Sequence, residues 1–182
     1  YKHMLLLPKL KKIDLVIHAS TTPPPRSLYS RSAGVMKAVG AGRAYGFDVM
    51  AGCNGATWAL ANAKSLLLTH DEWTTALVLV SDQLASYVDY ANETHLPLFN
   101  WADAVSAVVL RKGEARRAIV GEAFRTDPTY GDSMHLSPGA ATLTMETSDE
   151  IEDGIKRTYK KNYEEMIRAA LGRAGVEPRA VA

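Results

Sequence analysis

The single cysteine of this 182-residue chain, Cys53, is the residue best suited to covalent chemistry. It lies among small residues, between an apolar segment typical of a strand and an apolar segment typical of a helix. A thiol at the first turn of a helix faces unpaired backbone N–H groups and the positive end of the helix dipole. Both favour the thiolate, which is the nucleophilic form. Gly52 and Gly55 permit a sharp turn and close approach of a ligand. These residues predict a cysteine nucleophile at a strand-to-helix turn.

A structural role for Cys53 is the main alternative. A lone cysteine is more often a small, buried and inert side chain than a nucleophile. The flanking glycines favour the nucleophile, because a purely structural cysteine needs neither of them. Burial of Cys53 away from any helix start would therefore contradict the enzymatic interpretation.

Segments that alternate between strand and helix character must position this turn. The expected strands are residues 13–19, 44–50, 75–81 and 104–111. Helices are expected over residues 30–39, ending at Gly40, and from about Gly55 to Leu68. Strands that are apolar on both faces and alternate with helices are typical of a mainly parallel sheet covered on both sides. The pattern therefore predicts an α/β fold in which all four strands, including residues 104–111, are buried.

The remaining third of the chain has a different pattern. Residues 118–124 form a further strand candidate, and a loop rich in Gly, Pro and Ser runs from there to Gly139. A long helix is expected from about Ser148 to Arg173, with Thr147 and Glu150 at capping-box spacing and Gly175 beyond its end. A repeat of four residues predicts one buried stripe on this helix. The stripe consists of Ile151, Ile155, Tyr159, Tyr163, Ile167 and Leu171.

Composition narrows the functional classes. The formal net charge is +1, and no basic stripe with interleaved aromatic residues is present, which argues against a nucleic-acid partner. One cysteine excludes an internal disulfide and fits a reducing compartment. No apolar run approaches the ~18 residues of a membrane helix, and no secretory signal is recognisable at the start. We expect a cytoplasmic protein without a membrane anchor.

Other residues with reactive or ligand-binding side chains do not match the sequence patterns of catalytic, metal-binding or phosphate-binding sites. The five histidines show no metal-ligand spacing with one another or with Cys53, so no metal and no cofactor is expected. The glycine-containing run at residues 40–46 does not match a phosphate-binding loop, because its third glycine is one place late and the run precedes a strand. Asp82 and Asp89 follow the strand that ends at Ser81. Such carboxylates cap loops more often than they act as acids or bases.

Four segments, in a fixed order, carry a resemblance to a known family. They are the strand and Thr-rich loop at residues 13–23, Phe-Asp-Val-Met-Ala-Gly-Cys-Asn-Gly at 47–55, the strand at 76–82, and Trp-Ala-Asp-Ala-Val-Ser-Ala-Val-Val-Leu at 101–110. Together they resemble the thiolase superfamily, in particular its β-ketoacyl-carrier-protein synthase III branch. Cys53 matches the nucleophile of the family pattern F-D-x-x-x-A-C-x-G. No single segment is decisive, but the ordered set is specific and covers most of the chain.

The resemblance implies a fold and a domain organisation. The family fold is a layered α/β/α structure with a mixed, mainly parallel five-stranded sheet, and it is duplicated in the full-length protein. Residues 1–115 would be the N-terminal half with its first strand missing, and residues 116–182 the incomplete beginning of the C-terminal half. The catalytic histidine and asparagine of the family would lie beyond the end of this chain, so truncation is expected.

The resemblance also implies a reaction. Cys53 would take an acyl group from coenzyme A or an acyl-carrier protein, with its own backbone N–H in the oxyanion hole, and pass it on by decarboxylative condensation or by ester or amide formation. The pathway would be fatty-acid or secondary-metabolite biosynthesis. The acyl thioester is a substrate, and no cofactor is implied. Substrate contacts are expected from Leu28, Tyr29, Gly52, Asn54 and Asp103.

Family members are homodimers that pair through the strand before the nucleophile, here about residues 44–50. The loop at residues 23–29 would then reach towards the partner's acyl tunnel, with Leu28 or Tyr29 near its end. We therefore expect a homodimer in which this loop selects the length of the acyl chain.

One departure from the family and two alternatives remain. Asp103 is kept from the pattern F-G-D-G-A-G-A, but its glycines have become Ala102, Ala104 and Ser106, where any positive φ would strain or shift the backbone.

One alternative function is a non-catalytic partner subunit that keeps the fold alone. The other is a nucleotide- or cofactor-binding α/β domain, which would be expected to carry a glycine-rich turn after its first strand.

Overall fold

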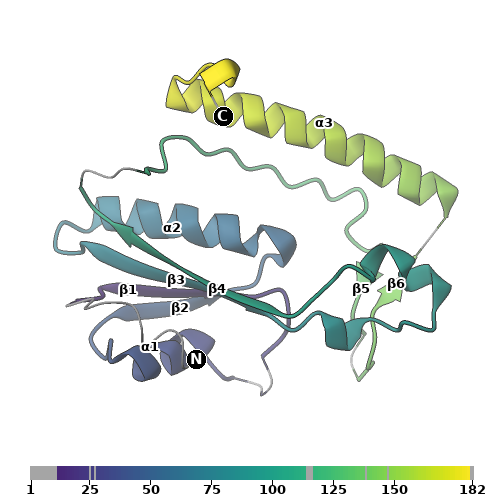
Figure 1. Cartoon of the computed structure of the whole chain (residues 1–182), viewed down its shortest axis with the longest axis horizontal. Coiled ribbons are helices and arrows are strands. Elements are labelled where there is room, and N and C mark those ends of the chain that lie inside the picture. The colour runs from purple at the N-terminus through teal and green to yellow at the C-terminus, as the bar shows by residue number, and fades with distance from the viewer. Residues whose placement is uncertain are drawn as a thin grey trace. The chain divides into compact units, whose positions relative to one another are not determined.

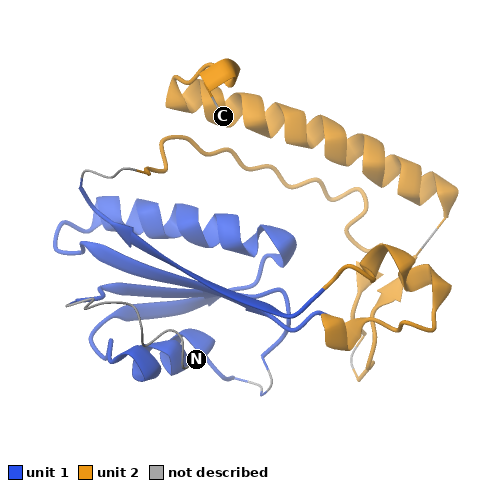
Figure 2. Ribbon diagram, viewed as in Figure 1, with its two compact units in different colours: residues 1–84, 102–115 blue, residues 85–101, 116–182 orange. Residues whose placement is uncertain are grey.

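The computed structural model describes residues 12–24, 26, 28–113, 117–137, 139–146 and 148–180. Contacts divide the chain into two compact units, residues 1–84 with 102–115 (unit 1) and residues 85–101 with 116–182 (unit 2), as Figure 2 shows. Unit 1 carries the sheet and Cys53, and unit 2 carries the long C-terminal helix. The expectation of a missing first strand concerns residues 1–11, which lie outside the described residues.

The sheet of unit 1 has the strand order β2-β1-β3-β4 among the described residues. Its strands are β1 (Leu15–Ala19), β2 (Tyr45–Val49), β3 (Thr75–Asp82) and β4 (Ala104–Arg111). β1 pairs in parallel with both β2 and β3, whereas β4 pairs antiparallel to β3. The prediction of an α/β fold with a mixed, mainly parallel sheet is confirmed, and the strand bounds agree to within two residues.

Two helices cover opposite faces of this sheet, α1 (Arg31–Val39) and α2 (Gly55–Thr69), as Figure 1 shows. Alternate residues of β1 point to the two sides. Leu15 and Ile17 belong to the core shared with α2, and Val16 belongs to the core shared with α1. α1 begins one residue later than expected, with Ser30 as its N-cap, and it ends at Gly40 with φ of 72°, as predicted. The expected α/β/α layering is confirmed.

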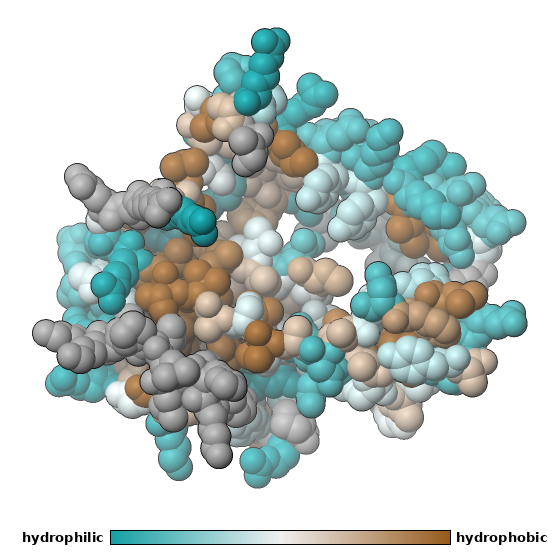
Figure 3. All heavy atoms as spheres, in the orientation of Figure 1, coloured by the Kyte–Doolittle hydropathy of each residue, from teal (hydrophilic) through white to brown (hydrophobic). Residues whose placement is uncertain are grey.

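The prediction that the segment at 104–111 is buried is wrong. Among the described strands, β4 pairs only with β3, and Val105 remains 66% exposed. Figure 3 shows hydrophobic side chains gathered at the surface over the strands of unit 1. An apolar sequence indicates that a strand is stabilised when other residues bury its side chains. It does not indicate that those residues belong to the same unit.

Unit 2 contains the long helix α3 (Asp149–Ala174) and the two-residue strands β5 (Met134–His135) and β6 (Thr144–Met145). The short strands lie within and just after the region predicted to be a loop. Buried His95 connects two parts of this unit. Its Nδ1 accepts a hydrogen bond from the backbone N–H of Asp89 at 2.9 Å, and its Nε2 bonds to the carbonyl of Leu143 at 3.0 Å.

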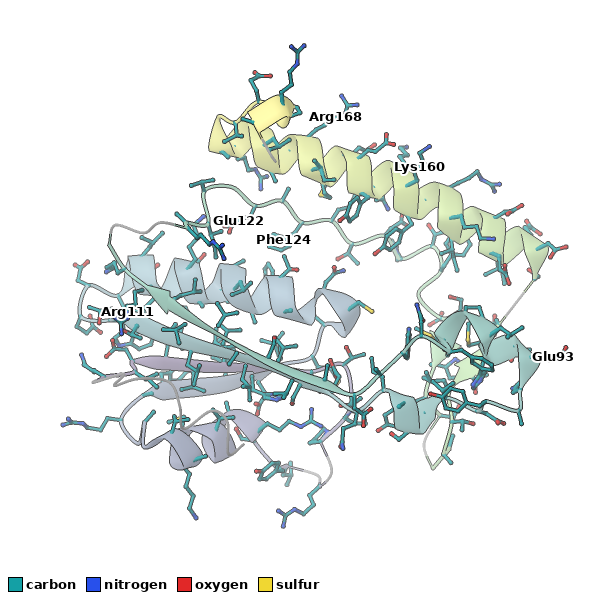
Figure 4. All side chains as sticks on the ribbon, viewed as in Figure 1. Glu93, Arg111, Glu122, Phe124, Lys160 and Arg168 are labelled. Atoms are coloured by element: carbon teal, nitrogen blue, oxygen red, sulfur yellow. The ribbon has the colours of Figure 1, made fainter. Side chains whose placement is uncertain are left out.

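The strand predicted at residues 118–124 is not formed in the described part of this segment. The segment is extended and runs along α3 instead, with Glu122 and Phe124 labelled in Figure 4. Gly121 packs so closely on α3 at Ala170 that a side chain would collide with the helix. The carbonyl of Glu122 accepts a hydrogen bond from Arg173 at 2.6 Å. A strand needs a neighbouring strand for its ladder, whereas here a helix is the neighbour.

The buried stripe predicted on α3 is also wrong. Tyr159, Tyr163 and Ile167 are 68%, 61% and 46% exposed. The buried position is Gly154, which packs under the ring of Tyr130. Sequence periodicity located an apolar stripe correctly, but the contacts within unit 2 use a different face of the helix.

The helix N-terminus differs from the prediction by one residue. Ser148 is the N-cap, and its hydroxyl accepts a hydrogen bond from the N–H of Ile151 at 3.2 Å. Thr147, the predicted cap, lies outside the described residues. The predicted end is confirmed, because Gly175 adopts φ of 63°. Within the described chain, no helix combines the length and apolar character that a membrane crossing requires.

Candidate active site

Cys53 lies where sequence analysis placed it, between β2 and α2. A short 3-10 turn, Gly52–Asn54, joins the two elements, and the thiol is exposed. The thiol therefore precedes the first residue of α2 by two positions. The arrangement that would have contradicted a nucleophile, a sulfur buried away from a helix start, is not found.

The two glycines beside Cys53 have different roles. Gly52 has φ of 53°, a left-handed conformation that favours glycine, and a Cβ atom there would meet nothing within 4 Å. Gly55 has φ of −53°, which any residue adopts in a helix, and a Cβ atom there would lie 3.7 Å from Cβ of Ala19. Only Gly52 needs to be glycine for its backbone conformation.

The predicted site residues belong to loops at one edge of the sheet. Because β1, β2 and β3 are parallel, the loops that follow them leave the sheet at the same edge. Cys53 and Asn54 follow β2, and Leu28 and Tyr29 follow β1. Asp103 directly precedes Ala104, which pairs with Asp82 at the end of β3. This carboxyl edge is where ligands bind in α/β sheets.

Leu28 has an unusual conformation for an apolar residue. Its φ is 59° and its side chain is fully exposed, and it is the only non-glycine residue with positive φ among those described. Such strain is concentrated at functional sites. Tyr29 is held more firmly, since its ring lies 5.4 Å from the guanidinium carbon of Arg26 and its hydroxyl lies against Gly34 of α1.

Asp82 holds the segment that follows β1. One carboxylate oxygen accepts hydrogen bonds from the N–H of Thr21 at 2.6 Å, the N–H of Thr22 at 3.0 Å and the hydroxyl of Ser20 at 3.0 Å. The expectation that Asp82 caps a loop is confirmed. Asp89 does likewise, because it accepts a hydrogen bond from the N–H of Ala91 at 2.9 Å.

Arg31 holds the same segment from the other side. Its guanidinium donates to the carbonyl of Thr22 at 2.8 Å and to the carbonyl of Pro23 at 2.6 Å. Asp48, at the end of β2, accepts hydrogen bonds from the backbone N–H groups of Arg31 and Ser32 at 3.1 and 2.7 Å. The aspartate of the Phe-Asp motif therefore caps α1 and places Arg31 at this edge.

A buried histidine, His18, lies beside this network. Its Nε2 is 2.7 Å from the hydroxyl of Ser81, whereas its Nδ1 is 3.9 Å from Asp48, too far for a hydrogen bond. Burial lowers the pKa of His18, and the positive charge of Arg31 lowers it further, against opposing effects of Asp48 and Asp82. The ring is therefore neutral at pH 7 and serves to bond β1 to β3.

Sequence analysis did not foresee that Arg31, Asp48, His18 and Ser81 act together. The hydrogen bonds of Arg31, Asp48, His18 and Ser81 in this network join residues that are 8 to 63 positions apart. No local spacing rule connects such positions. The available signal was the placement of Asp48 and Asp82 near the ends of β2 and β3, the two parallel strands that flank β1.

The replaced glycines before and within β4 do not strain the backbone. Ala102, Ala104 and Ser106 all avoid positive φ, since Leu28 alone among described non-glycine residues has it. β4 pairs regularly with β3 along its length. The described backbone therefore shows none of the strain that these replacements would cause at a positive φ. The described residues also contain no cluster of three or more His, Cys, Asp or Glu side chains that could hold a metal.

Known proteins with similar sequences and folds include β-ketoacyl-carrier-protein synthases III. The family model for 3-oxoacyl-[acyl-carrier-protein (ACP)] synthase III matches residues 47–128, a span that contains Cys53, α2, β3 and β4. A β-ketoacyl-[acyl-carrier-protein] synthase III of Microcystis aeruginosa is 27% identical over 163 residues, which are 90% of this chain and 47% of the relative. This chain is synthase III-like, with a thiolase-type fold.

Solved structures agree with the synthase III likeness. The crystal structure of 3-oxoacyl-[acyl-carrier-protein] synthase III from Aquifex aeolicus matches with a TM-score of 0.77 and 25% identity, over 93% of this chain and 52% of that protein. A tetronic acid condensing enzyme, AbyA1, matches with a TM-score of 0.64 and 25% identity, over 91% and 52%. The synthase III-like chain thus spans about half the length of the proteins it matches.

Proposed function

We propose that this chain is the cysteine-bearing part of a synthase III-type acyltransferase, which forms an acyl-enzyme on Cys53. The observation that carries the proposal is the exposed thiol at a strand-to-helix turn, at the carboxyl edge of a thiolase-type sheet. The synthase III names of its relatives support the same reaction class. Gly52 supports it further, because its left-handed backbone fixes the course of the turn that presents Cys53.

The first half-reaction exchanges one thioester for another. The thiolate of Cys53 attacks the carbonyl carbon of an acyl thioester, and the C–S bond to the donor then breaks. The donor leaves as a thiolate and takes up a proton equivalent to the one that Cys53 lost. The backbone N–H of Cys53 would stabilise the negative charge that develops on the carbonyl oxygen. Coenzyme A and acyl-carrier protein are the proposed donors.

The second half-reaction transfers the acyl group. In a condensation, a malonyl thioester loses CO₂ and its carbanion attacks the acyl carbon, and Cys53 leaves as thiolate. In ester or amide formation, an alcohol or amine attacks instead. The names of the synthase III relatives and of the tetronic acid condensing enzyme favour condensation, in fatty-acid or secondary-metabolite biosynthesis. The histidine and asparagine that would assist belong to the part of the family fold outside this chain.

We further propose a homodimer that pairs through residues 44–50. β2 lies at the edge of the described sheet, and Tyr45 at its start is 58% exposed, so the strand is free to pair. The assignment of residues 1–115 and 116–182 to two halves of the family fold is part of the same proposal. Substrate contacts from Leu28, Tyr29, Gly52, Asn54 and Asp103 are proposed on their placement in loops at the carboxyl edge.

The hydrogen bonds of the loop after β1 argue against a phosphate-binding domain. The N–H groups of Thr21 and Thr22, which a phosphate would need, already bond to Asp82. A negatively charged ligand would have to displace this carboxylate. The loop therefore lacks the open N–H groups of a nucleotide site.

Intact-mass measurement tests the proposed function. The full-length protein is incubated with a panel of acyl-coenzyme A donors, and the mass and the released coenzyme A are followed. We expect a mass increase equal to one acyl group in the wild type and none in Cys53→Ala. A labelled, folded Cys53→Ala variant would refute the role of Cys53. A wild type that accepts no donor while its thiol reacts freely with iodoacetamide would favour a non-catalytic partner subunit.

A further inference from the structure

We propose that Asp82 and Arg31 are positioning residues that set acyl-chain selectivity by clamping the segment after β1. The clamped segment is Ser20–Pro23, and the acyl loop is defined as residues 23–29, which continue from it. This inference rests on the proposed function. It adds a specificity role for two side chains that need not touch the acyl group.

The clamp forms hydrogen bonds with both the N–H groups and the carbonyl groups of the segment. Asp82 accepts hydrogen bonds from the N–H groups of Thr21 and Thr22, at 2.6 and 3.0 Å. Arg31 donates to the carbonyls of Thr22 and Pro23, at 2.8 and 2.6 Å. Each bond has a charged partner, so each is stronger than a bond between neutral groups. The negative and positive side chains fix the orientation of four successive peptide units, from Ser20–Thr21 to the unit that follows Pro23.

Both side chains of the clamp are themselves fixed. Ser81, next to Asp82, bonds to buried His18 at 2.7 Å. Arg31 is the first residue of α1, and Asp48 accepts hydrogen bonds from its N–H and from that of Ser32. The clamp thus joins the ends of β1, β2 and β3 to the start of α1.

The clamped segment lies beside the turn that carries Cys53. The N–H of Ser20 donates to the carbonyl of Val49, at the end of β2, at 3.1 Å. A Cβ atom on Gly55, two residues after Cys53, would lie 3.7 Å from Cβ of Ala19. Within the segment, Ser20 and Thr22 are buried, at 4% and 5% exposed, whereas Thr21 is half-buried and Pro23 is exposed. A shift of this segment would change the surroundings of an acyl group on Cys53.

The acyl loop depends on the clamp for its starting direction. Beyond Pro23, Leu28 is fully exposed and has φ of 59°. Cys53 lies on the turn between β2 and α2, whereas the side-chain hydrogen bonds of Asp82 and Arg31 go to residues 20–23. Loss of the clamp is therefore expected to change which acyl chains are accepted, while the intrinsic reactivity of the thiol is kept.

Asp14 offers a matched control at the other end of the same strands. One of its carboxylate oxygens accepts hydrogen bonds from the N–H groups of Thr74 and Thr75, at 2.8 and 3.1 Å. This is the same device, two successive N–H groups on one carboxylate oxygen, and it also joins β1 to β3. It lies at the amino ends of the strands, opposite the edge that carries Cys53.

The experiment compares acyl-enzyme formation from acetyl- and octanoyl-coenzyme A in Asp82→Ala, Asp82→Asn, Arg31→Met and Asp14→Asn, all in the full-length protein. Alkylation of Cys53 by iodoacetamide and thermal unfolding serve as controls. We expect the ratio of the two acylation rates to change about tenfold in Asp82→Ala and in Arg31→Met, with alkylation unchanged. Asp82→Asn, which keeps an acceptor oxygen, should recover most of the wild-type ratio, and Asp14→Asn should leave the ratio unchanged.

The outcomes separate this inference from the function it rests on. Absence of an acyl-enzyme in the wild type would overturn the proposed function and the inference with it. A wild type that is acylated, with the same rate ratio in Asp82→Ala and Arg31→Met, would overturn the inference alone. An equal change of the ratio in Asp14→Asn would also overturn it, because the effect would then follow from general loosening of the sheet.

Discussion

The two ends of the parallel strands use the same bond for different purposes. At the amino end, Asp14 ties the start of β1 to Thr74 and Thr75. At the carboxyl end, Asp82 ties the end of β3 to Thr21 and Thr22. Asp14 is 6% exposed and pairs with Lys12 at 2.8 Å, whereas Asp82 is half-buried and holds a segment beside the turn that carries Cys53. Similar bonds can therefore stabilise a fold at one end of a sheet and arrange a site at the other.

The pKa of Asp14 reflects its structural role. Burial alone would raise this pKa, but the hydrogen bond and charge of Lys12 and the N–H groups of Thr74 and Thr75 outweigh burial and lower it from 3.8 to about 2. The folded state thus favours the carboxylate. Above pH 4 this preference contributes its full stability, and the contribution is lost as the pH falls towards 2.

The largest expected effect distinguishes the two ends by stability. Asp14→Ala removes a buried carboxylate that pairs with Lys12 and accepts hydrogen bonds from Thr74 and buried Thr75, and it should lower the free energy of unfolding by about 3 kcal/mol. Asp82→Ala should cost about 1 to 2 kcal/mol, because the carboxylate of Asp82 is only half-buried. Urea denaturation of both variants measures the difference. A larger loss of stability in Asp82→Ala than in Asp14→Ala would contradict the proposed difference between the two ends of the sheet.

The pH dependence of stability tests the structural role of Asp14. Between pH 4 and pH 2, the wild type should lose about 2 kcal/mol of stability that Asp14→Asn does not lose, because the neutral amide has no carboxylate to protonate. The difference in unfolding free energy between the two proteins is measured by urea denaturation at each pH. A difference that stays constant over this range would show that Asp14 is not the titrating group.

A smaller effect is expected at the turn that carries Cys53. Gly52→Ala should lower stability by about 1 to 2 kcal/mol, because alanine is strained at a φ of 53°. Gly55→Ala, with ordinary contact to Ala19, should change stability by less than about 0.5 kcal/mol. Thermal unfolding of the pair tests this difference. Equal losses would mean that space, rather than the left-handed backbone, selects glycine here.

The smallest effect is expected in the acyl loop. Leu28→Asn should raise stability by about 0.5 kcal/mol, since asparagine tolerates the left-handed region and no buried contact is lost. The acyl-donor preference should change in the same variant, as it should in Leu28→Ala and Tyr29→Ala. The measurements are thermal unfolding and acylation rates over a donor panel. An unchanged donor preference in all three variants would remove the acyl loop from substrate selection.

Sequence patterns predicted the elements of unit 1 well because each pattern is local. The apolar runs predicted β1 to β4 to within two residues, and Gly40 predicted the end of α1. They failed where burial depends on distant neighbours. β4 is apolar and exposed, the stripe with Tyr159 and Tyr163 faces outward, and residues 118–124 pack along a helix instead of joining a sheet.

The candidate site divides in the same way. The setting of Cys53 could be predicted, because a strand, a small-residue turn and a helix follow one another in the chain. The clamp could not, because Asp82 and Thr21 are 61 residues apart and meet only when β1 and β3 pair. The setting of Cys53 and the resemblance to synthase III both predict a nucleophile at this turn, but neither predicts these supporting bonds.

Peptide mapping of the acylated protein tests the central claim most directly. The full-length protein is incubated with an acyl-coenzyme A donor and digested, and the peptide that contains Cys53 is fragmented in the mass spectrometer. The account predicts an acyl group on the sulfur of Cys53 that neutral hydroxylamine removes, as expected of a thioester. An acyl group found on another residue, with Cys53 unmodified, would contradict it.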